Sequence, residues 1–548
     1  MIGKTLKELV QNGISTYSKK VAFSMYERED MTFEEVGQRV AHVQDILINS
    51  GLNSGDKVVI LSSNMPNWGV CYFAVTTAAM VAVPLLPDFT NDDLDMLIEH
   101  SGAKALLVSD KLYARISKGV LDKLNVVVRT KNLKVVSQNV VEKGAFVDPK
   151  PEDLAVILYT SGTTSKPKGV MLTHHNLVSQ INLLEDLFPL NENDASLSVL
   201  PLSHTYESSL GLIYHFSCGA NTTYLDRPPT ASTLLPALKN VRPTTLLIVP
   251  LIIEKIFRTQ VQAKFSSTAF WRTICKVDFV KNYLYRVAGK KLMKVFGGRL
   301  RFLAIGGAKL DVETEKFLHT AKIPYGIGYG LTETAPLLAG AVPSNTLVGS
   351  AGYAAKGVTL RLDNIDPVTK QGEIVALSPC VMQGYYKNED ATRDAFTEDG
   401  WFRTGDLGAF AEDGRLYIMG RLKNMILGPS GENIYPEEIE TVLNAHRFIA
   451  ESIVTEKEGR LVALVNFDTE AIEAKMEEWR DELDEKMVVW ERRKDEVMKE
   501  IRDYVNAKVN RFSKISEVVE EKDDFVKTPT HKIKRYLYRG GYKHEEEK

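Results

Sequence analysis

The sequence has few cysteines and little excess charge of either sign. Lys and Arg number 68 and Asp and Glu 71, so the net charge of −3 provides no general attraction for nucleic acid. The four cysteines show neither metal-ligand spacing nor the density of a disulfide-stapled secreted domain. We therefore expect no nucleic-acid partner and a protein of the reducing cytosol. The cysteines, all far apart in the chain, are Cys71, Cys218, Cys275 and Cys380.

The sequence also lacks a long uninterrupted apolar run. Residues 1–20 alternate apolar and charged side chains, which predicts a short amphipathic helix rather than a signal peptide. Residues 70–86 are long enough to consider as a membrane span, but Tyr72, Thr76 and Thr77 dilute the stretch and a strand-like VAVPLL closes it. We interpret it as a buried helix followed by a strand, and we expect a cytoplasmic protein.

Short apolar runs recur through residues 1–330, separated by segments of helix length. Examples are KVVILSS, AKALLVS, DLAVILYT, TTLLIVP and RFLAIGG. This alternation predicts α/β layers with largely parallel sheets. Residues 348–419 instead favour strands and turns, with an Asp413-Gly414 turn inside a hairpin-like stretch.

The length of 548 residues exceeds what one ordinary hydrophobic core supports, so at least two domains are expected. A boundary falls at residues 420–424, where GRLKN separates a strand from the glycine-rich GPSGENIYP. We predict an α/β fold with a large N-terminal domain of stacked sheets at residues 1–421. This domain includes a β-rich subdomain at 348–421, and residues 422–548 form a small α+β C-terminal domain.

Two segments have helical patterns among many charges. In the C-terminal domain five apolar residues share one helical face, which predicts a buried stripe: Met476, Trp479, Leu483, Met487 and Trp490. Residues 270–301 mix aromatic with basic side chains and could lie on an anionic membrane surface. We favour a solvated helical face there, because charge runs usually mean no more than that, and membrane contact stays open.

The strongest chemical signal is YTSGTTSKPKG at residues 159–169, which follows the buried-strand pattern LAVIL. Gly162 allows the backbone N–H groups to turn inward, hydroxyls add hydrogen bonds, and Lys166 and Lys168 add positive charge, as a phosphate-binding loop requires. The loop is not a Walker motif, because Pro167 stands where the second glycine should be. Composition alone would also allow a flexible turn, and the order of the residues argues against it.

That order resembles the signature of the adenylate-forming superfamily, which includes acyl-CoA synthetases, firefly luciferase and peptide-synthetase adenylation domains. Four further stretches resemble the family's other motifs in the family's order. They are YGLTET at 329–334, GWFRTGDLG at 400–408, GRLKNMILGPSGENIYPEEIE at 420–440 and KTPTHKIKR at 527–535. Five motifs spread over nearly the whole chain make chance agreement negligible.

The resemblance implies an AMP-forming acid–thiol ligase that uses ATP and Mg²⁺. A carboxylate attacks the α-phosphorus of ATP, so two anions must meet while pyrophosphate leaves. In the family, Lys532 bridges these anions, Glu333 binds the magnesium ion, and the neighbouring Thr332 contacts the α-phosphate. Asp406 accepts hydrogen bonds from both ribose hydroxyls with help from Arg421.

The remaining nucleotide contacts that the resemblance implies come from three stretches of backbone. Tyr329 stacks on the adenine, and glycines let the backbone approach the ring and the phosphates closely. These nucleotide-binding residues are Thr160, Ser161, Gly162, Thr163, Thr164, Lys168, Gly306, Gly307, Ala308, Tyr329 and Gly330. Taken singly, Tyr329 would be an ordinary core aromatic and Asp406 an ordinary turn residue.

For the second half-reaction with coenzyme A (CoA), the family rotates its C-terminal domain. Lys423 occupies the family's hinge position, and Gly431 would line the tunnel through which the thiol arrives. Residues 201–207, PLSHTYE, resemble the border of the acyl pocket in long-chain acyl-CoA synthetases, with His204 and Tyr206 as gate or wall residues. A structural His and Tyr would look the same, so these two interpretations are equally weighted.

A ligase of medium- or long-chain fatty acids is the function that we favour, because small apolar residues follow the PLSHTYE stretch and no cation is evident there. The alternative is an acyl-acyl carrier protein synthetase or an adenylate-forming partner of a carrier domain. A catalytically degenerate binding protein is disfavoured, since Lys532, Glu333 and Asp406 are all present. Luciferase-like oxidation and a homodimer stay open.

Overall fold

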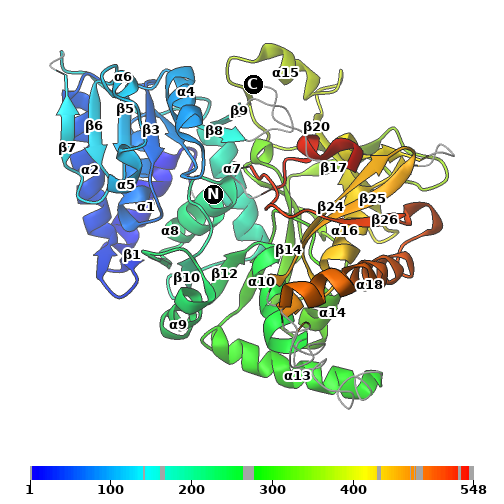
Figure 1. Ribbon diagram of the computed structural model, residues 1–548. Helices are drawn as coiled ribbons and strands as arrows, with labels where there is room; N and C mark the ends of the chain where they lie inside the picture. Colours follow the sequence, from blue (N-terminus) through cyan, green and yellow to red (C-terminus); the bar gives the residue numbers. More distant parts are fainter. Residues whose placement is uncertain are drawn as a thin grey trace.

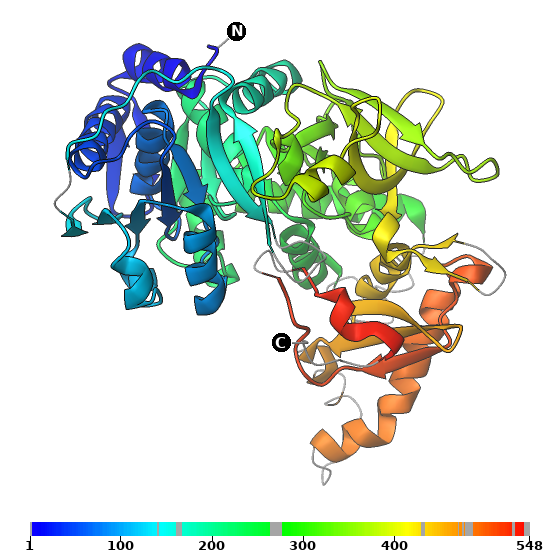
Figure 2. The same cartoon turned by 90° about the horizontal axis from the view of Figure 1, so that it is seen from above.

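The computed structural model describes residues 3–139, 142–160, 167–262, 277–428, 433–469, 471–473, 476, 486–528 and 532–541. Two large sheets form the centre of the molecule, and the C-terminal elements lie to one side of them (Figures 1 and 2). This mixed α/β architecture, with a large N-terminal part and a smaller C-terminal one, is the fold class that the sequence predicts.

The first large sheet has eight strands in the order β19-β9-β8-β4-β3-β5-β6-β7. Its centre is parallel, and β7, β9 and β19 pair antiparallel with their neighbours. The strands are β3 (Lys57–Leu61), β4 (Val81–Pro84), β5 (Ala105–Val108), β6 (Val126–Arg129), β7 (Val135–Gln138), β8 (Leu154–Thr160), β9 (Lys168–Thr173) and β19 (Gly384–Tyr385).

The second large sheet has nine strands in the order β16-β15-β14-β13-β12-β10-β11-β1-β2. The run from β14 to β1 is parallel, as buried strands between helices usually are. The strands are β1 (Val21–Met25), β2 (Glu29–Thr32), β10 (Ala195–Ser198), β11 (Asn221–Tyr224), β12 (Thr245–Ile248), β13 (Phe302–Ile305), β14 (Tyr325–Gly330), β15 (Leu337–Gly340) and β16 (Tyr353–Ala354).

Helices cover both sheets and bury their apolar faces against them. Every residue of α3 (Pro66–Thr77) is buried, and β4 follows it, which confirms the prediction of a buried helix and a strand. The predicted N-terminal amphipathic helix is α1 (Leu6–Tyr17). The remaining helices of this part are α2 (Phe33–Asn49), α4 (Asn91–Ser101), α5 (Asp110–Tyr113), α6 (Lys118–Leu121), α7 (His174–Leu187), the π-helix η1 (Tyr206–Tyr214), α8 (His215–Ser217), α9 (Ala231–Val241), α10 (Pro250–Phe257), the π-helix η2 (Arg258–Gln262), α13 (Asp278–Val295) and α14 (Val312–Thr320).

A four-stranded antiparallel sheet follows, as the strand-and-turn character of its sequence indicates. It consists of β17 (Thr359–Asp363), β18 (Gly372–Leu377), β20 (Phe402–Phe410) and β21 (Leu416–Arg421). Gly414 has φ 85° in the hairpin between β20 and β21, a backbone conformation that glycine adopts without strain. This part of the chain also contributes β16 and β19 to the large sheets and contains the short helix α15 (Glu389–Asp394).

After β21 the chain passes through the 3-10 turn η4 (Leu422–Asn424) into the C-terminal elements. They have their own apolar core, in which Met476 and Trp490 are buried as predicted, while Trp479, Leu483 and the side chain of Met487 lie outside the described residues. The elements are β22 (Ile426–Leu427), β23 (Asn433–Ile434), α16 (Pro436–Asn444), β24 (Ile449–Lys457), β25 (Arg460–Phe467), α18 (Lys486–Asn506), η5 (Arg511–Ser513), β26 (Glu517–Glu520) and η6 (Arg535–Gly541).

Within the described ranges, no helix has both the length and the apolar character needed to cross a membrane.

Candidate active site

Several of the predicted site residues lie where β14 ends, at the carboxyl edge of the parallel strands, which is where open α/β sheets bind ligands. Gly330 is the last residue of β14, and a Cβ there would lie 1.7 Å from the Pro336 carbonyl oxygen. The Leu331 N–H donates to the same oxygen at 3.0 Å. Only glycine permits this close turn, which leads directly into the 3-10 turn η3 (Thr332–Thr334) that carries Thr332 and Glu333.

Glu333 is connected to the predicted phosphate loop through a tyrosine. The Tyr385 hydroxyl donates to Glu333 Oε1 at 2.9 Å. Lys168 Nζ lies 4.9 Å from the centroid of the Tyr385 ring, at the start of β9. Thr160 pairs with Lys168 across the β8–β9 ladder. The structure thus brings both ends of the loop near Glu333, while Ser161, Gly162, Thr163 and Thr164 lie outside the described residues.

Asp406 on β20 forms the second polar centre. Tyr329 Oη donates to its Oδ2 at 2.8 Å, and Arg421 Nε contacts its Oδ1 at 2.8 Å. Burial raises the pKa of this carboxyl, and the charges of Arg421 and Lys532 oppose that rise. An ionised carboxylate has about four acceptor positions, so both oxygens keep capacity for further donors.

Lys532 lies within electrostatic reach of both centres. The protein packed around Lys532 lowers its pKa, first by desolvation and then through the charge of Arg421, although part of the residue contacts solvent. Asp406 and Glu333 raise that pKa. The Thr528 N–H donates to the Lys532 carbonyl at 2.8 Å. We call Glu333, Asp406, Arg421 and Lys532 the charged site.

The predicted adenine contacts follow β13. Gly307 has φ 88°, and a Cβ on Gly306 would lie 3.3 Å from the Gly328 carbonyl oxygen and 3.4 Å from Tyr206 Cζ. Small residues are therefore required where β13 ends beside β14. Tyr206 closes the other side of this position, and its hydroxyl donates to the Ala304 carbonyl at 2.9 Å. Ala308 follows on the same exposed turn.

The charge of Lys532 acts on His204, and the nearby Tyr206 lines an apolar cavity. Burial, and then the charge of Lys532, lowers the pKa of His204 to about 4, so the imidazole is neutral near pH 7. Its Nδ1 accepts a hydrogen bond from the Tyr206 N–H at 3.2 Å. Tyr206 lines a cavity of about 60 Å³ between α7, η1 and strands β12 to β15. Tyr206 is therefore a wall residue of this apolar cavity, whereas His204 is not among the residues that line it.

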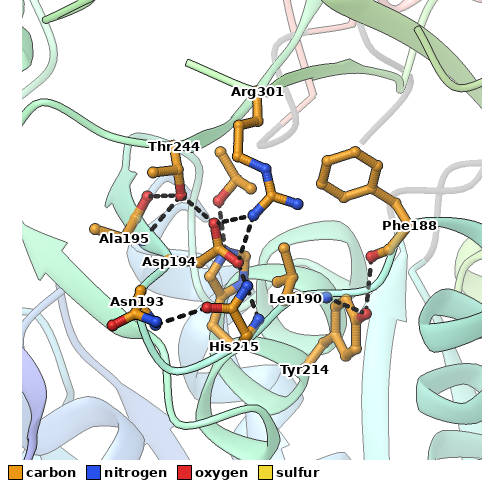
Figure 3. Close-up of polar contacts among 11 residues, drawn as sticks. Phe188, Leu190, Asn193, Asp194, Ala195, Tyr214, His215, Thr244 and Arg301 are labelled. Carbon is orange, nitrogen blue, oxygen red and sulfur yellow. Dashed lines mark hydrogen bonds and ion pairs between the residues drawn. The ribbon is translucent and has the colours of Figure 1, made fainter. Parts of the chain in front are cut away.

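Tyr214 and His215, two polar residues of the cavity wall, are hydrogen-bonded to neutral groups, and Figure 3 draws both side chains. The Tyr214 hydroxyl donates to the Phe188 carbonyl at 2.9 Å and accepts from the Leu190 N–H at 3.2 Å. His215 is bonded through its two ring nitrogens to the Leu210 carbonyl and the Thr245 hydroxyl, and burial lowers its pKa. Lys, Arg, Asp and Glu do not occur among the lining residues.

Two charged residues behind this wall, Asp194 and Arg301, pair with each other. Arg301 Nη1 contacts Asp194 Oδ1 at 2.8 Å, and the Thr244 hydroxyl donates to the same oxygen at 2.7 Å (Figure 3). Asp194 is buried, so this pairing removes what would otherwise be an uncompensated charge beside an apolar space.

Two predicted residues belong to the junction with the C-terminal elements. Lys423 lies in η4, directly after β21 leaves the four-stranded sheet. Gly431 lies outside the described residues. Sequence analysis missed Tyr385 and the residues other than Tyr206 that line the cavity. Tyr385 stands in a stretch that matches none of the five motifs, and the lining residues come from separate elements that only packing brings together.

The comparisons with known proteins agree with this geometry. The family model of AMP-binding enzymes matches residues 10–386. The long-chain-fatty-acid–CoA ligase FadD15 of Mycobacterium bovis is 30% identical over 481 residues, covering 81% of this chain and 78% of that protein.

Solved structures show the same fold. The o-succinylbenzoate CoA synthetase MenE of Bacillus subtilis, in complex with its acyl-adenylate intermediate, has a TM-score of 0.76 at 22% identity, covering 98% of this chain and 99% of that chain. The same enzyme with ATP and a magnesium ion has a TM-score of 0.75 at 21% identity, covering 96% and 98%. The chain belongs to the AMP-binding enzyme family and is an adenylate-forming acid–CoA ligase.

Proposed function

We propose that this ligase activates a medium- or long-chain fatty acid as its acyl-adenylate, releasing pyrophosphate, and then transfers the acyl group to CoA, releasing AMP. The observation that carries the proposal is the apolar cavity lined by Tyr206, whose N–H donates to His204, the residue on which the charge of Lys532 acts. The name of the FadD15 relative, a long-chain-fatty-acid–CoA ligase, supports the same class of acid.

The chemistry of the cavity wall selects for an uncharged tail. A second carboxylate or an ammonium group placed there would be desolvated without a partner, at a cost of several kcal/mol. A methylene chain is instead stabilised by about 0.8 kcal/mol for each buried CH₂ group. The wall therefore favours an aliphatic acid over an acid with a second charge.

The size of the cavity adds a condition. A volume of about 60 Å³ holds only a few carbon atoms and is far below the roughly 300–1,000 Å³ of sites that enclose larger ligands. A longer tail must widen the space. We expect the Tyr206 side chain to move as the tail enters, because a single hydrogen bond at 2.9 Å holds its hydroxyl to the Ala304 carbonyl.

In the first half-reaction the charged site would lower the repulsion between the two substrates. The Lys532 ammonium bridges the attacking carboxylate and the α-phosphate, with Thr332 as a further α-phosphate contact. Asp406 accepts from the ribose hydroxyls, and Arg421 keeps that carboxyl ionised. Tyr329 orients Asp406 through its hydroxyl and presents its ring to the adenine.

The donor set near the phosphates suits a magnesium ion carried by ATP. Mg²⁺ usually takes one or two protein carboxylates and completes its shell with phosphate oxygens and water. Glu333 supplies one such carboxylate, and the Tyr385 hydroxyl fixes its Oε1. When bound, the ion would neutralise charge on the β- and γ-phosphates. The β8–β9 loop, with Thr160 and Lys168 at its ends, would hold the same phosphates.

For the second half-reaction Lys532 must leave so that the thiol can reach the acyl carbonyl. Lys423, in the turn where the chain enters the C-terminal elements, is the proposed hinge, and Gly431 is proposed to line the thiol path. Lys423→Pro should spare adenylation and slow thioester formation. Equal losses in both half-reactions, measured in single-turnover assays, would contradict the hinge assignment.

The decisive experiment is a panel of acids from acetate to oleate with purified protein, ATP, Mg²⁺ and CoA, scored for AMP against ADP. We expect CoA-dependent AMP release that increases from acetate to the longer acids. Preference for a short or doubly charged acid would contradict the substrate class, and ADP as the product would contradict the mechanism. Acid-dependent ATP/pyrophosphate exchange without turnover of free CoA would indicate a carrier protein as the acceptor.

A further inference from the structure

Helix α13 has two faces of opposite character. Its buried face, formed by Tyr285, Gly289 and Leu292, contacts α9 and α14. The Tyr285 ring packs edge-on against Phe317 with centroids 5.2 Å apart. Gly289 allows close approach, because a Cβ there would lie 2.7 Å from the Ala321 carbonyl oxygen. Packing therefore fixes how the helix is rotated about its axis.

The opposite face carries aromatic and basic side chains that contact solvent. Phe279 is 83% exposed and Tyr283 63% exposed, and Arg286, Lys290 and Lys294 are exposed as well. These residues recur at i, i+4, i+7, i+11 and i+15, so at 3.6 residues per turn they form one stripe along the helix. We call these five residues the outer stripe.

The charge on this helix is strongly positive although the whole chain carries a net charge of −3. Lys281 contacts Glu313 at 3.7 Å beside the stripe. Among the residues that the structure describes, Arg286, Lys290, Lys291 and Lys294 form no ion pair. The positive potential along the outer face is therefore not neutralised within this part of the protein.

A merely solvated face does not explain the two rings. Solvated helical faces carry charged and small polar side chains, whereas Phe279 and Tyr283 lie in line with the cations. Rings that enter the headgroup region, flanked by Lys and Arg, are the pattern of helices that lie on a bilayer surface. The sequence analysis favoured a solvated face, and the exposure of both rings instead supports contact with a bilayer.

We propose that the outer stripe docks on an anionic lipid bilayer. Phe279 and Tyr283 would enter the interface between headgroups and acyl chains, and Arg286, Lys290 and Lys294 would lie against the lipid phosphates. Figure 1 shows α13 at the lower margin of the molecule, where a flat surface can approach it. Docking on a bilayer requires no turnover, so this proposal does not depend on the proposed substrate.

The test is co-sedimentation of the full chain with vesicles of phosphatidylcholine and with vesicles that also contain phosphatidylglycerol. We expect binding to the anionic vesicles only, weakening as salt is raised. Replacing Arg286, Lys290 and Lys294 together by Gln should weaken binding about a hundredfold, since each cation near the surface contributes roughly fivefold. Replacing Phe279 and Tyr283 by Ser should weaken it about tenfold.

The matched control replaces Lys111, Lys131 and Lys134 by Gln, which removes the same charge beside β6 and β7, far from α13 in Figure 1. This variant should bind as the unchanged protein does. Equal weakening in the control, or binding without preference for phosphatidylglycerol, would overturn the proposal. A change of oligomeric state in the outer-stripe variants with unchanged vesicle binding would make the surface a protein interface and overturn it too.

Discussion

The charged site and the apolar cavity are connected through His204 and Tyr206, yet their polar groups are arranged in opposite ways. In the charged site, carboxylates and cations face one another, as Asp406 and Arg421 do at 2.8 Å across the β20–β21 hairpin. In the cavity wall, polar atoms such as those of His215 are satisfied by backbone and hydroxyl groups.

This difference matches what each region has to do. A site for two anions needs cations that are already in place, because such groups act strongly where water is reduced. A compartment for an uncharged tail needs walls whose polar atoms already have partners, because an unpaired buried polar atom costs about 1–3 kcal/mol. Substitutions in the charged site and in the cavity wall therefore test this difference between the two regions.

The largest effect is expected for Lys532→Ala. Part of this residue contacts solvent, so the variant should fold normally. Loss of its cation should slow acid-dependent ATP/pyrophosphate exchange about 10²–10³-fold, as for other lost transition-state donors. Lys522→Ala removes the charge of another exposed lysine of the same region and should leave exchange unchanged. Similar rates for both variants would show that Lys532 does not act on the reacting groups.

Asp406→Asn should have the next largest effect. The substitution removes the charge that Arg421 faces and weakens acceptance from the ribose, so kcat/KM for ATP should fall about 10- to 100-fold. Tyr329→Phe removes only the hydroxyl donor to Asp406 and should cost about fivefold. Steady-state kinetics with ATP varied measures both. A loss confined to the KM for the acid would place Asp406 outside the nucleotide site.

A smaller and more selective effect is expected for Leu187→Trp, which adds volume at the cavity wall. The longest acid that the enzyme accepts should lose about tenfold in kcat/KM, while short acids should change little. Leu187→Met keeps the volume and serves as the control. Equal losses for short and long acids would mean that the tail lies elsewhere.

The smallest effect concerns Glu207, a carboxyl on the apolar side. Burial raises its pKa from 4.5 to about 8. A carboxyl whose folded pKa is raised contributes most to stability below its unfolded pKa, and this contribution is lost as pH rises from about 4.5 to about 8. The stability of Glu207→Gln should decrease less over this pH range. By pH 8 the thermal midpoints of the variant and the unchanged protein should differ by a few degrees. Parallel curves for the two proteins would show that Glu207 is not protonated in the fold.

Much of the fold was predictable because its signals are local. Alternating buried strands and helices predicted the α/β layers, and dilution by Thr76 and Thr77 identified α3 as a buried helix rather than a span. The residues of the charged site stand in contiguous motifs, so the sequence could name them. The spatial proximity of these residues could not be predicted from their spacing, because β14, β20 and Lys532 are separated by long stretches of chain.

The sequence by itself determined the family, the reaction class and the residues proposed to bind the nucleotide, because each of these depends on short runs of particular residue types. Only the tertiary structure decided which side chains enclose the cavity, how Tyr385 supports Glu333 and which face of α13 is left uncovered. Packing joins residues far apart in the chain, and a periodic pattern shows that a helix has two faces without showing what covers each of them.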